Sequence, residues 1–323
     1  MKLVVVSICK NEQKTIGKVL DRIPKKMTGI TSIEKLVIDD GSTDNTAQVA
    51  REHGATVIQN FRQKRLAYSF QKAVDYMLEN GADIAVNIDG DNQFDSNEIP
   101  LLIEPIVSGK ADFVAADRFT DPFTGKNRAI ENMPKSKYWG NILGAWVVSK
   151  MSGQKFKDVT CGFRAYSRET LLHININNKF TYTQETFQVI AAKNLNILNV
   201  PVTVKYFKGR KSRVVENMYV YIFKSASNIL KAFRDYSPLQ FFGWLGMIPF
   251  VPGILSLAFV GIHFLRNGSF SPFKFVGGIG IYLLSLAILS WLVAILADIQ
   301  NRVIHNQEKI LYYSKKTFFN KKK

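Results

Sequence analysis

Cysteine and histidine are both scarce in this sequence. Cys9 and Cys161 are the only cysteines among 323 residues, and they lie far apart in the chain. Two isolated cysteines exclude a disulfide framework and are typical of a protein from a reducing compartment. The 4 histidines share no metal-binding spacing, so the sequence does not indicate a histidine-based metal centre.

Acidic residues are few compared with basic ones. The chain has 43 Lys and Arg against 26 Asp and Glu, which gives a formal net charge of +17. Such an excess indicates an anionic partner, and three kinds fit it: nucleic acid, an acidic membrane surface or a phosphate-bearing substrate.

Charge is missing altogether from two long stretches near the C-terminus. No Asp, Glu, Lys or Arg occurs in residues 236–265 or 275–297. Each stretch supplies the roughly 20 apolar residues that cross a hydrocarbon core. We therefore predict two transmembrane helices, at about residues 239–265 and 275–298. A basic tail, residues 299–323, follows, and the positive-inside rule then predicts a multi-pass membrane protein whose N-terminal part and both termini are cytoplasmic.

Glycine within the apolar stretches favours close helix packing. Gly246 and Gly253 lie in the first stretch, and Gly277, Gly278 and Gly280 lie in the second. Small residues allow helix backbones to approach each other, either within one hairpin or between copies in a homo-oligomer. The sequence leaves both arrangements open.

The N-terminal part alternates short apolar runs with helical patterns. The β-prone runs occupy residues 3–8, 35–38, 56–59, 84–88, 112–116 and 197–204. Helical patterns occur between them, for example in residues 66–78. Strands that alternate with helices predict an α/β fold with a mostly parallel, Rossmann-like sheet and flanking helices.

Two aspartates follow the fourth of these runs. Asp89 and Asp91 are separated by Gly90, which has no side chain and so lets the chain turn until both carboxylates can reach one hard cation. Ligands of open α/β sheets bind at the carboxyl ends of the strands, so the position suits a metal site. A polar turn that binds no metal could have the same sequence.

Short polar motifs follow the strands in a definite order. They are Lys10-Asn11-Glu12, Asp39-Asp40-Gly41-Ser42-Thr43-Asp44, Asp89-Gly90-Asp91 with Gln93, Asp117-Arg118, the segment from Asp158 to Tyr166, Glu185, Val200-Pro201 and Ser212-Arg213. In this order they resemble family-2 glycosyltransferases of GT-A fold, and more narrowly the polyprenyl-phosphate group that is similar to dolichol-phosphate-mannose synthase. The two apolar stretches resemble the branch of that group that anchors its own catalytic domain in the membrane.

The resemblance implies a division of the chain. Residues 1–215 would form the cytoplasmic GT-A catalytic domain, and residues 239–298 the transmembrane hairpin. Residues 216–238 mix apolar and basic side chains, and we interpret them as juxtamembrane amphipathic helices. An ordinary surface helix would have a similar pattern.

The resemblance also implies a metal-dependent catalytic site. Asp91 and Gln93, with Asp89, would hold Mg²⁺ or Mn²⁺ through oxygen atoms, and the substrate diphosphate would fill other positions. Asp89, Asp91, Asp158 and Arg164 are the expected catalytic residues. For Asp158 and Arg164 the alternative is a buried ion pair that stabilises the turn between them.

Donor and acceptor contacts follow from the same resemblance. The expected nucleotide-sugar contacts are Ile8, Lys10, Glu12, Val37, Asp39, Asp40, Asp89, Gly90, Asp91, Arg118, Glu185, Arg210 and Arg213. The acceptor phosphate would contact Arg164, Ser212 and Arg213. Other roles remain open for some of them: a helix-terminal carboxylate for Glu12, an N-cap for Asp40 and a surface salt bridge for Arg118.

The activity implied is inverting, metal-dependent transfer of a single hexose from a GDP-mannose or UDP-glucose type donor. The acceptor would be dolichyl or undecaprenyl phosphate at the cytoplasmic membrane face. A phosphate monoester has a second pKa of about 6, so it is largely anionic at neutral pH and needs no strong general base. Inversion is expected because no residue stands out as a covalent nucleophile.

Two other functions fit parts of the sequence. A family-2 enzyme could extend a polysaccharide, but such synthases usually carry a Gln-x-x-Arg-Trp motif, which is missing here. A basic, membrane-anchored binding module would explain the net positive charge but not the ordered motifs. We do not expect nucleic acid as a partner, because acidic pairs around Asp39, Asp89 and Asp117 would repel a polyanion.

Overall fold

The structure is a computed structural model in which the chain forms two units. It describes residues 1–128, 130–131, 133, 135–176, 182–206, 227, 230–231, 233–234 and 237–320. One unit comprises Met1–Phe223 with Tyr312–Lys323, and the other comprises Lys224–Leu311.

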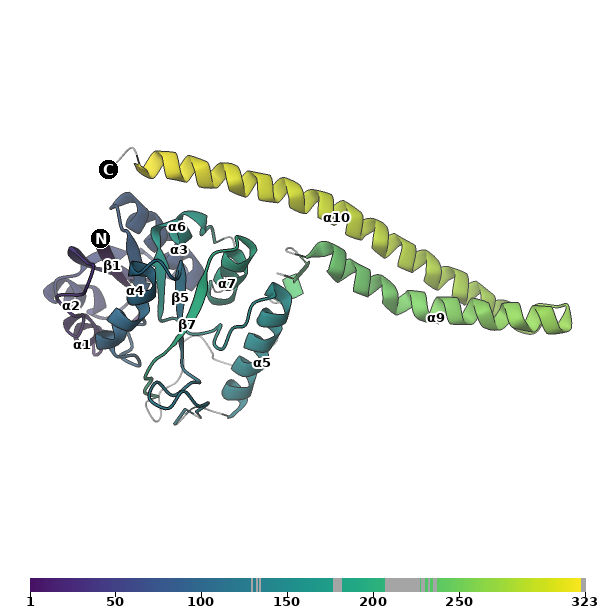
Figure 1. Cartoon of the computed structure of the whole chain (residues 1–323), viewed down its shortest axis with the longest axis horizontal. Coiled ribbons are helices and arrows are strands. Elements are labelled where there is room, and N and C mark those ends of the chain that lie inside the picture. The colour runs from purple at the N-terminus through teal and green to yellow at the C-terminus, as the bar shows by residue number, and fades with distance from the viewer. Residues whose placement is uncertain are drawn as a thin grey trace. The chain divides into compact units, whose positions relative to one another are not determined.

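A seven-stranded sheet forms the centre of the first unit, in the order β3-β2-β1-β4-β6-β5-β7. Figure 1 labels β1, β5 and β7 of this sheet. The strands are β1 (Lys2–Cys9), β2 (Ser32–Asp39), β3 (Thr56–Gln59), β4 (Ile84–Asn87), β5 (Phe113–Asp117), β6 (Arg164–Ser167) and β7 (Ile197–Pro201). Strand β6 pairs antiparallel with β4 and with β5, whereas the other pairs are parallel. The predicted mostly parallel α/β sheet is confirmed.

Helices cover both faces of this sheet. One face carries α1 (Ile16–Asp21), α2 (Thr46–Glu52) and α4 (Ile99–Val107), with the short 3-10 helix η1 (Ser96–Glu98) before α4. The other face carries α3 (Leu66–Glu79), α5 (Lys135–Ser152), α6 (Arg168–His173) and α7 (Thr183–Ala192).

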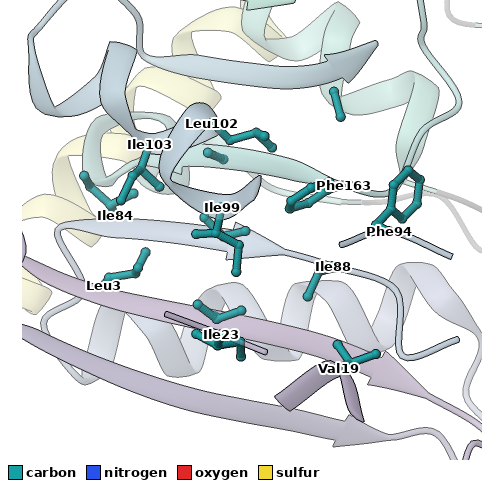
Figure 2. Close-up of a cluster of buried hydrophobic side chains, with 14 of the residues drawn as sticks. Leu3, Val19, Ile23, Ile84, Ile88, Phe94, Ile99, Leu102, Ile103 and Phe163 are labelled. Atoms are coloured by element: carbon teal, nitrogen blue, oxygen red, sulfur yellow. The ribbon is translucent and has the colours of Figure 1, made fainter. Parts of the chain in front are cut away.

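The core explains why the apolar runs form strands. In β1, Leu3 and Val5 join the cluster under α1 and α4, whereas Val4 and Val6 join the cluster under α3. Side chains of a strand alternate between the two faces, so a strand buried on both sides is apolar along most of its length. Figure 2 shows the first cluster, in which Phe94 and Phe163 lie on loops next to the strand ends.

The sequence did not predict β6. This segment of four residues, Arg164 to Ser167, is too short and too polar to be recognised from the sequence as a buried strand. It lies between β4 and β5, and because it runs antiparallel to them, it begins at the edge where they end. The loop that precedes β6 therefore reaches that edge as well.

The second unit is formed mainly by α9 (Pro238–Asn267) and the first part of α10 (Lys274–Asn320). Both helices are long and apolar enough to cross a membrane, and only 17% of the most apolar window of each is buried. Helix α10 continues beyond residue 298, where the predicted transmembrane segment ends.

Glycines bring α9 and α10 close together. A Cβ added at Gly253 would lie 3.2 Å from the carbonyl oxygen of Gly280, and one added at Gly280 would lie 2.9 Å from Leu257. The Ser290 hydroxyl donates to the carbonyl of Phe242 at 2.9 Å. The predicted close glycine packing therefore occurs within one hairpin, and a homo-oligomer stays a prediction.

The last turns of α10, from Tyr312 on, pack within the first unit. Tyr312 donates a hydrogen bond to Glu169 at 2.7 Å, and its ring stacks on His173 with centroids 4.3 Å apart. Lys315 donates to the carbonyl of Ile174 at 2.9 Å. Phe319 is only 8% exposed, so the last turns of α10 contribute to the core of the first unit.

Two adjacent phenylalanines test this docking, by which we mean the packing of the last turns of α10 within the first unit. Phe319→Ala should lower the free energy of unfolding by about 3 kcal/mol, because it removes a buried aromatic side chain and leaves a cavity. Phe318→Ala is the control, since Phe318 is 53% exposed and its removal should change stability by about 0.5 kcal/mol or less. Unfolding of the detergent-purified chain measures both, and equal losses would contradict the docking.

Candidate active site

The carboxyl ends of the parallel strands meet at one edge of the sheet. The register pairs Cys9 of β1 with Asp39 of β2, and Val6 of β1 with Asn87 of β4. Strand β5 ends at Asp117 on the same edge, because both it and β4 are antiparallel to β6. The polar motifs that the sequence places after separate strands therefore gather at one site.

The loop after β1 is bonded to the loop after β2. The backbone N–H of Asn11 donates to Ser42 Oγ at 2.9 Å, and Asn11 Oδ1 accepts from the N–H of Thr43 at 2.8 Å. The N–H of Glu12 donates to Thr46 Oγ1 at 2.8 Å. The expected nucleotide contacts Lys10 and Glu12 are thus held beside the Asp39 motif, and Lys10 also donates to Gln63.

Asp39 and Asp40 have different surroundings. Asp39 accepts from the N–H of Ser42 at 2.9 Å and from the Gln59 side chain at 3.2 Å. The carboxylate of Asp40, only 5% exposed, accepts hydrogen bonds from Asn60, Lys64, Arg65 and Ser69. Asp40 therefore fixes the loop before α3, and its predicted contact with the nucleotide stays a prediction.

Two apolar positions were also expected to contact the donor. Val37 is completely buried in β2, where it belongs to the core cluster. Ile8 is partly buried and packs against the cluster on the other face of the sheet. Val37 therefore stabilises the strand that carries Asp39, and the structure leaves a donor contact at Ile8 or Val37 as a prediction.

Gly90 and Gly162 allow the two-aspartate motif to pack tightly. A Cβ at Gly90 would collide with Cys9 Sγ, so the turn between Asp89 and Asp91 fits only a glycine without displacement of its neighbours. A Cβ at Gly162 would lie 2.6 Å from Asp89 Oδ1. The loop before β6 thus approaches the Asp89 carboxylate with its backbone.

Backbone contacts fix the segment after Asp91. Asp91 Oδ1 accepts from the N–H of Gln93 at 3.0 Å, and the carbonyl of Gln93 accepts from the N–H of Lys205 at 2.9 Å. Residue 92 has a positive φ of 59°, which Asn tolerates better than most residues. The backbone of the predicted ligand Gln93 is therefore fixed by two hydrogen bonds, one to the Asp91 carboxylate and one from Lys205.

The side-chain oxygen atoms at this edge of the sheet suit a hard divalent cation. Asp89, Asp91 and Gln93 offer carboxylate and amide oxygens, which Mg²⁺ and Mn²⁺ prefer. Within the part of the chain that the structure describes, no three His, Cys, Asp or Glu residues are grouped to hold a metal ion. A cation at this edge would therefore take several of its ligands from a bound substrate or from water.

Arg118 and Asp158 form a buried ion pair. Arg118 Nε donates to Asp158 Oδ2 at 2.6 Å and Nη2 donates to Oδ1 at 2.9 Å. Asp158 is fully buried and Arg118 is 5% exposed. Burial alone would raise the pKa of Asp158, but the charge and hydrogen bonds of Arg118 lower it below its ordinary value. The ion pair of Asp158 with Arg164 that the sequence left open is therefore wrong, because Asp158 pairs with Arg118. The surface salt bridge considered for Arg118 is wrong as well, because the pair is buried, and a nucleotide-sugar contact of Arg118 stays a prediction.

Arg164 is fully buried at the start of β6. Its guanidinium donates to the carbonyls of Cys161 at 2.7 Å and Val159 at 3.1 Å, and it lies 4.8 Å from the ring centroid of Phe187. Arg164 thus braces the loop that approaches Asp89. The predicted contact of Arg164 with an acceptor phosphate stays a prediction.

Two residues that support the site were not identified from the sequence. Asn87, the last residue of β4, donates to the carbonyl of Gly162 at 2.6 Å and to the Tyr182 hydroxyl at 2.9 Å. An asparagine at the end of an otherwise apolar strand is the only sequence signal for this role. Tyr182 gave no signal, because its partners are distant in the chain.

Four expected site residues lie wholly or partly outside the part of the chain that the structure describes. Arg210, Ser212 and Arg213 lie outside the described residues. Glu185 belongs to α7, but its side chain is also outside the described part. Their predicted roles remain predictions.

Comparison with known proteins identifies the class of protein that this fold and site belong to. The family model described as glycosyl transferase family 2 matches residues 4–174, and the chain belongs to this family. The resemblance to family-2 enzymes inferred from the motifs is thereby confirmed.

Two related proteins show which members of the family this chain is similar to. The chain is 31% identical to a dolichyl-phosphate hexose transferase of Haloferax volcanii over 208 residues, which is 64% of this chain and 84% of that protein. It is 27% identical to a UDP-N-acetylglucosamine–dolichyl-phosphate N-acetylglucosaminyltransferase of Methanococcus voltae, over 63% of this chain and 85% of the relative.

Solved structures confirm the fold. Glucosyl-3-phosphoglycerate synthase from Mycobacterium tuberculosis, in complex with UDP, aligns with a TM-score of 0.56 and 18% identity over 72% of this chain and 80% of that one. Its complex with Mn²⁺, UDP and glucosyl-3-phosphoglycerate gives a TM-score of 0.55 over 73% and 79%. A divalent metal is therefore compatible with this fold.

The approach of Gly162 to Asp89 can be tested with a single methyl group. Gly162→Ala should displace the Asp89 carboxylate or the loop, and a misplacement of about 1 Å is expected to lower the transfer rate on the order of 10²-fold. Gly140→Ala is the matched control, because a Cβ there meets no atom within 4 Å. Release of nucleoside diphosphate measures the rate, and equal rates for both variants would contradict the role of Gly162.

The Arg118–Asp158 pair should make stability depend on pH. Asp158→Asn should lower the free energy of unfolding by about 3–5 kcal/mol near neutral pH, since it leaves Arg118 buried without its charge partner. The wild-type contribution is present above the unfolded pKa of about 3.9 and is lost as the pH falls through the lowered folded pKa. Denaturant unfolding at pH 7 and at pH 3 should therefore show a smaller difference between wild type and variant in acid.

An exposed carboxylate provides the control for that experiment. The side chain of Asp21 is 58% exposed beside His53, so Asp21→Asn should change the free energy of unfolding of the protein only slightly. A difference between wild type and Asp158→Asn that is the same at both pH values would contradict the assignment of the pair.

Proposed function

We propose that this glycosyltransferase moves one hexose from a nucleotide-sugar to a polyprenyl phosphate, with inversion, at the cytoplasmic face of a membrane. The observation that carries the proposal is the meeting of the Asp89 carboxylate, two residues before Asp91, with the Gly162 loop at the sheet edge. The dolichyl-phosphate transferases among the relatives support the acceptor class.

In this proposal Asp91 and Gln93, with Asp89, hold Mg²⁺ or Mn²⁺. When bound, the cation neutralises charge on the donor diphosphate and on the leaving nucleoside diphosphate. The tight turns at Gly90 and beside Gly162 position the carboxylates before substrate arrives, so that little reorganisation is needed during the reaction.

The loops after β1 and β2 would bind the nucleotide. Asp39 would accept from the base or the ribose, and Lys10 and Glu12 lie on the loop that is bonded to the Asp39 motif. Asp40 would act indirectly, by fixing the loop before α3. These contacts do not select between GDP-mannose and UDP-glucose type donors.

The acceptor phosphate would approach from the side of the loop before β6. One of its oxygens attacks C1 of the sugar, the bond from C1 to the diphosphate breaks, and the nucleoside diphosphate leaves with the electron pair. The phosphate is already anionic at neutral pH, so no strong base is required. A single displacement of this kind inverts the configuration at C1.

Arg118, Asp158 and Arg164 would position this loop. Arg118 and Asp158 bind each other, and Arg164 binds the backbone of the same loop. The acceptor phosphate itself would be bound by Ser212 and Arg213, with Arg210 near the diphosphate and Glu185 facing the sugar. This assignment gives Arg164 a supporting role in addition to the predicted contact with the acceptor phosphate.

The hairpin of α9 and α10 would anchor the enzyme where its lipid acceptor resides. Both helices have the length and the apolar composition to span a bilayer. The basic residues after the second apolar stretch favour a cytoplasmic position for the catalytic unit and both termini.

The metal and the acceptor can be tested together. Purified chain is incubated with labelled nucleotide-sugars and a short polyprenyl phosphate, with Mn²⁺ or with a chelator. We expect lipid-linked sugar only with metal, and a loss on the order of 10²-fold or more in Asp91→Ala. Glu79→Ala changes an exposed carboxylate at the end of α3 and should retain full activity.

The outcomes separate the possible functions. Full lipid product in the presence of chelator would contradict the metal site. Transfer to a sugar acceptor but not to a lipid phosphate would indicate a polysaccharide-building enzyme, and would contradict the proposed acceptor.

A further inference from the structure

Helix α5 carries an exposed apolar stripe. Trp139 is 66% exposed, Leu143 is 61% exposed and Trp146 is 61% exposed. Their spacing of four and three residues places them on one side of the helix. Large apolar side chains that are grouped at a surface usually mark a contact with a partner or a membrane.

The opposite side of α5 is buried. Asn141 is 4% exposed, Ala145 is 3% exposed and Val148 is fully buried, and the last two belong to the core cluster shared with α3 and α7. The orientation of the helix is therefore set by packing on the core. Trp139, Leu143 and Trp146 remain on the outer side, where the first unit offers them little cover.

The charges near the stripe have one sign. Residues 135–152 contain three lysines and no Asp or Glu. Lys150, which falls on the same side of the helix as Trp146, is exposed, and Lys155 just beyond the helix is exposed as well. An apolar stripe flanked by lysines complements a bilayer surface with anionic headgroups.

We propose that the outer face of α5, defined by Trp139, Leu143, Trp146 and Lys150, lies in the headgroup region of an anionic membrane. Tryptophan prefers this region because its ring is apolar while its N–H can reach water or headgroups. Lysine can bury its alkyl chain along the apolar surface while its ammonium group reaches phosphate. The catalytic unit then has a membrane contact of its own, in addition to the hairpin.

The proposed contact between α5 and the membrane depends on one part of the proposed function, namely that the chain is anchored in a membrane. It would hold the catalytic unit against the surface in which a polyprenyl phosphate resides. The site edge and α5 are connected directly, because Thr160 of the loop before β6 donates to the Asn141 side chain at 2.8 Å. A helix seated on the bilayer would thus be linked to the loop that approaches Asp89.

A spin label on α5 tests the proposal. Both native cysteines, Cys9 and Cys161, are 1% exposed, and burial raises the pKa of the Cys161 thiol to about 12, so a nitroxide reagent should react selectively with an introduced cysteine. Leu143→Cys in the full chain is labelled and reconstituted into vesicles of phosphatidylcholine with phosphatidylglycerol. Electron paramagnetic resonance then measures collision of the label with oxygen, which concentrates in lipid, and with a water-soluble nickel chelate.

The proposal predicts high oxygen and low nickel accessibility for the label at residue 143. Leu101→Cys is the matched control, because Leu101 is 51% exposed on α4, on the opposite face of the sheet. Its label should remain accessible to nickel.

Three results would overturn the proposal. A label at residue 143 that is accessible to nickel would place α5 in water. Low accessibility to both reagents would place the stripe under protein, either a second copy or another segment of this chain. Lipid-like accessibility at both labelled positions would show that the contact is not specific to α5. None of these readouts needs sugar transfer, so a failure of the proposed acceptor would be recognised separately.

Discussion

The close approach of the backbone at Gly162 to the Asp89 carboxylate is the constraint on which this site depends. A Cβ at residue 162 would lie 2.6 Å from the carboxylate, so a larger residue there would displace either the carboxylate or the loop. Asn87 bonds the same loop to β4, and Arg164 braces it from the core. A buried network of this kind holds polar groups in place because every displacement would leave hydrogen bonds unmade.

The sheet topology explains why these groups meet. Parallel strands bring the ends of β1, β2, β4 and β5 to one edge, where their polar motifs converge. The antiparallel strand β6 begins at that edge and delivers the loop from Asp158 to Phe163 between the ends of β4 and β5. The proposed nucleotide side and the proposed acceptor side of the site are therefore built from different parts of one sheet.

The sequence predicts the parallel strands and the two-aspartate motif because both are local patterns. Residues 3–8 and 84–88 are apolar except for Ser7 and Asn87, and Asp89 follows the second run directly. It does not predict β6, since a strand of four residues that begins with Arg164 has no apolar pattern and its burial depends on distant aromatic rings. Nor does it predict the pairing of Arg118 with Asp158, which lie 40 residues apart. Contacts of this length are set by topology, and local sequence patterns do not encode them.

We propose that the carboxylates at the end of β4 hold a divalent cation together with a nucleoside diphosphate. A crystal of the chain grown with Mn²⁺ and UDP or GDP, with diffraction recorded at the manganese absorption edge, tests it most directly. We expect an anomalous peak in contact with a carboxylate oxygen of Asp91 and with oxygens of the diphosphate. A diphosphate bound at the sheet edge with no anomalous peak beside Asp89 or Asp91 would contradict it.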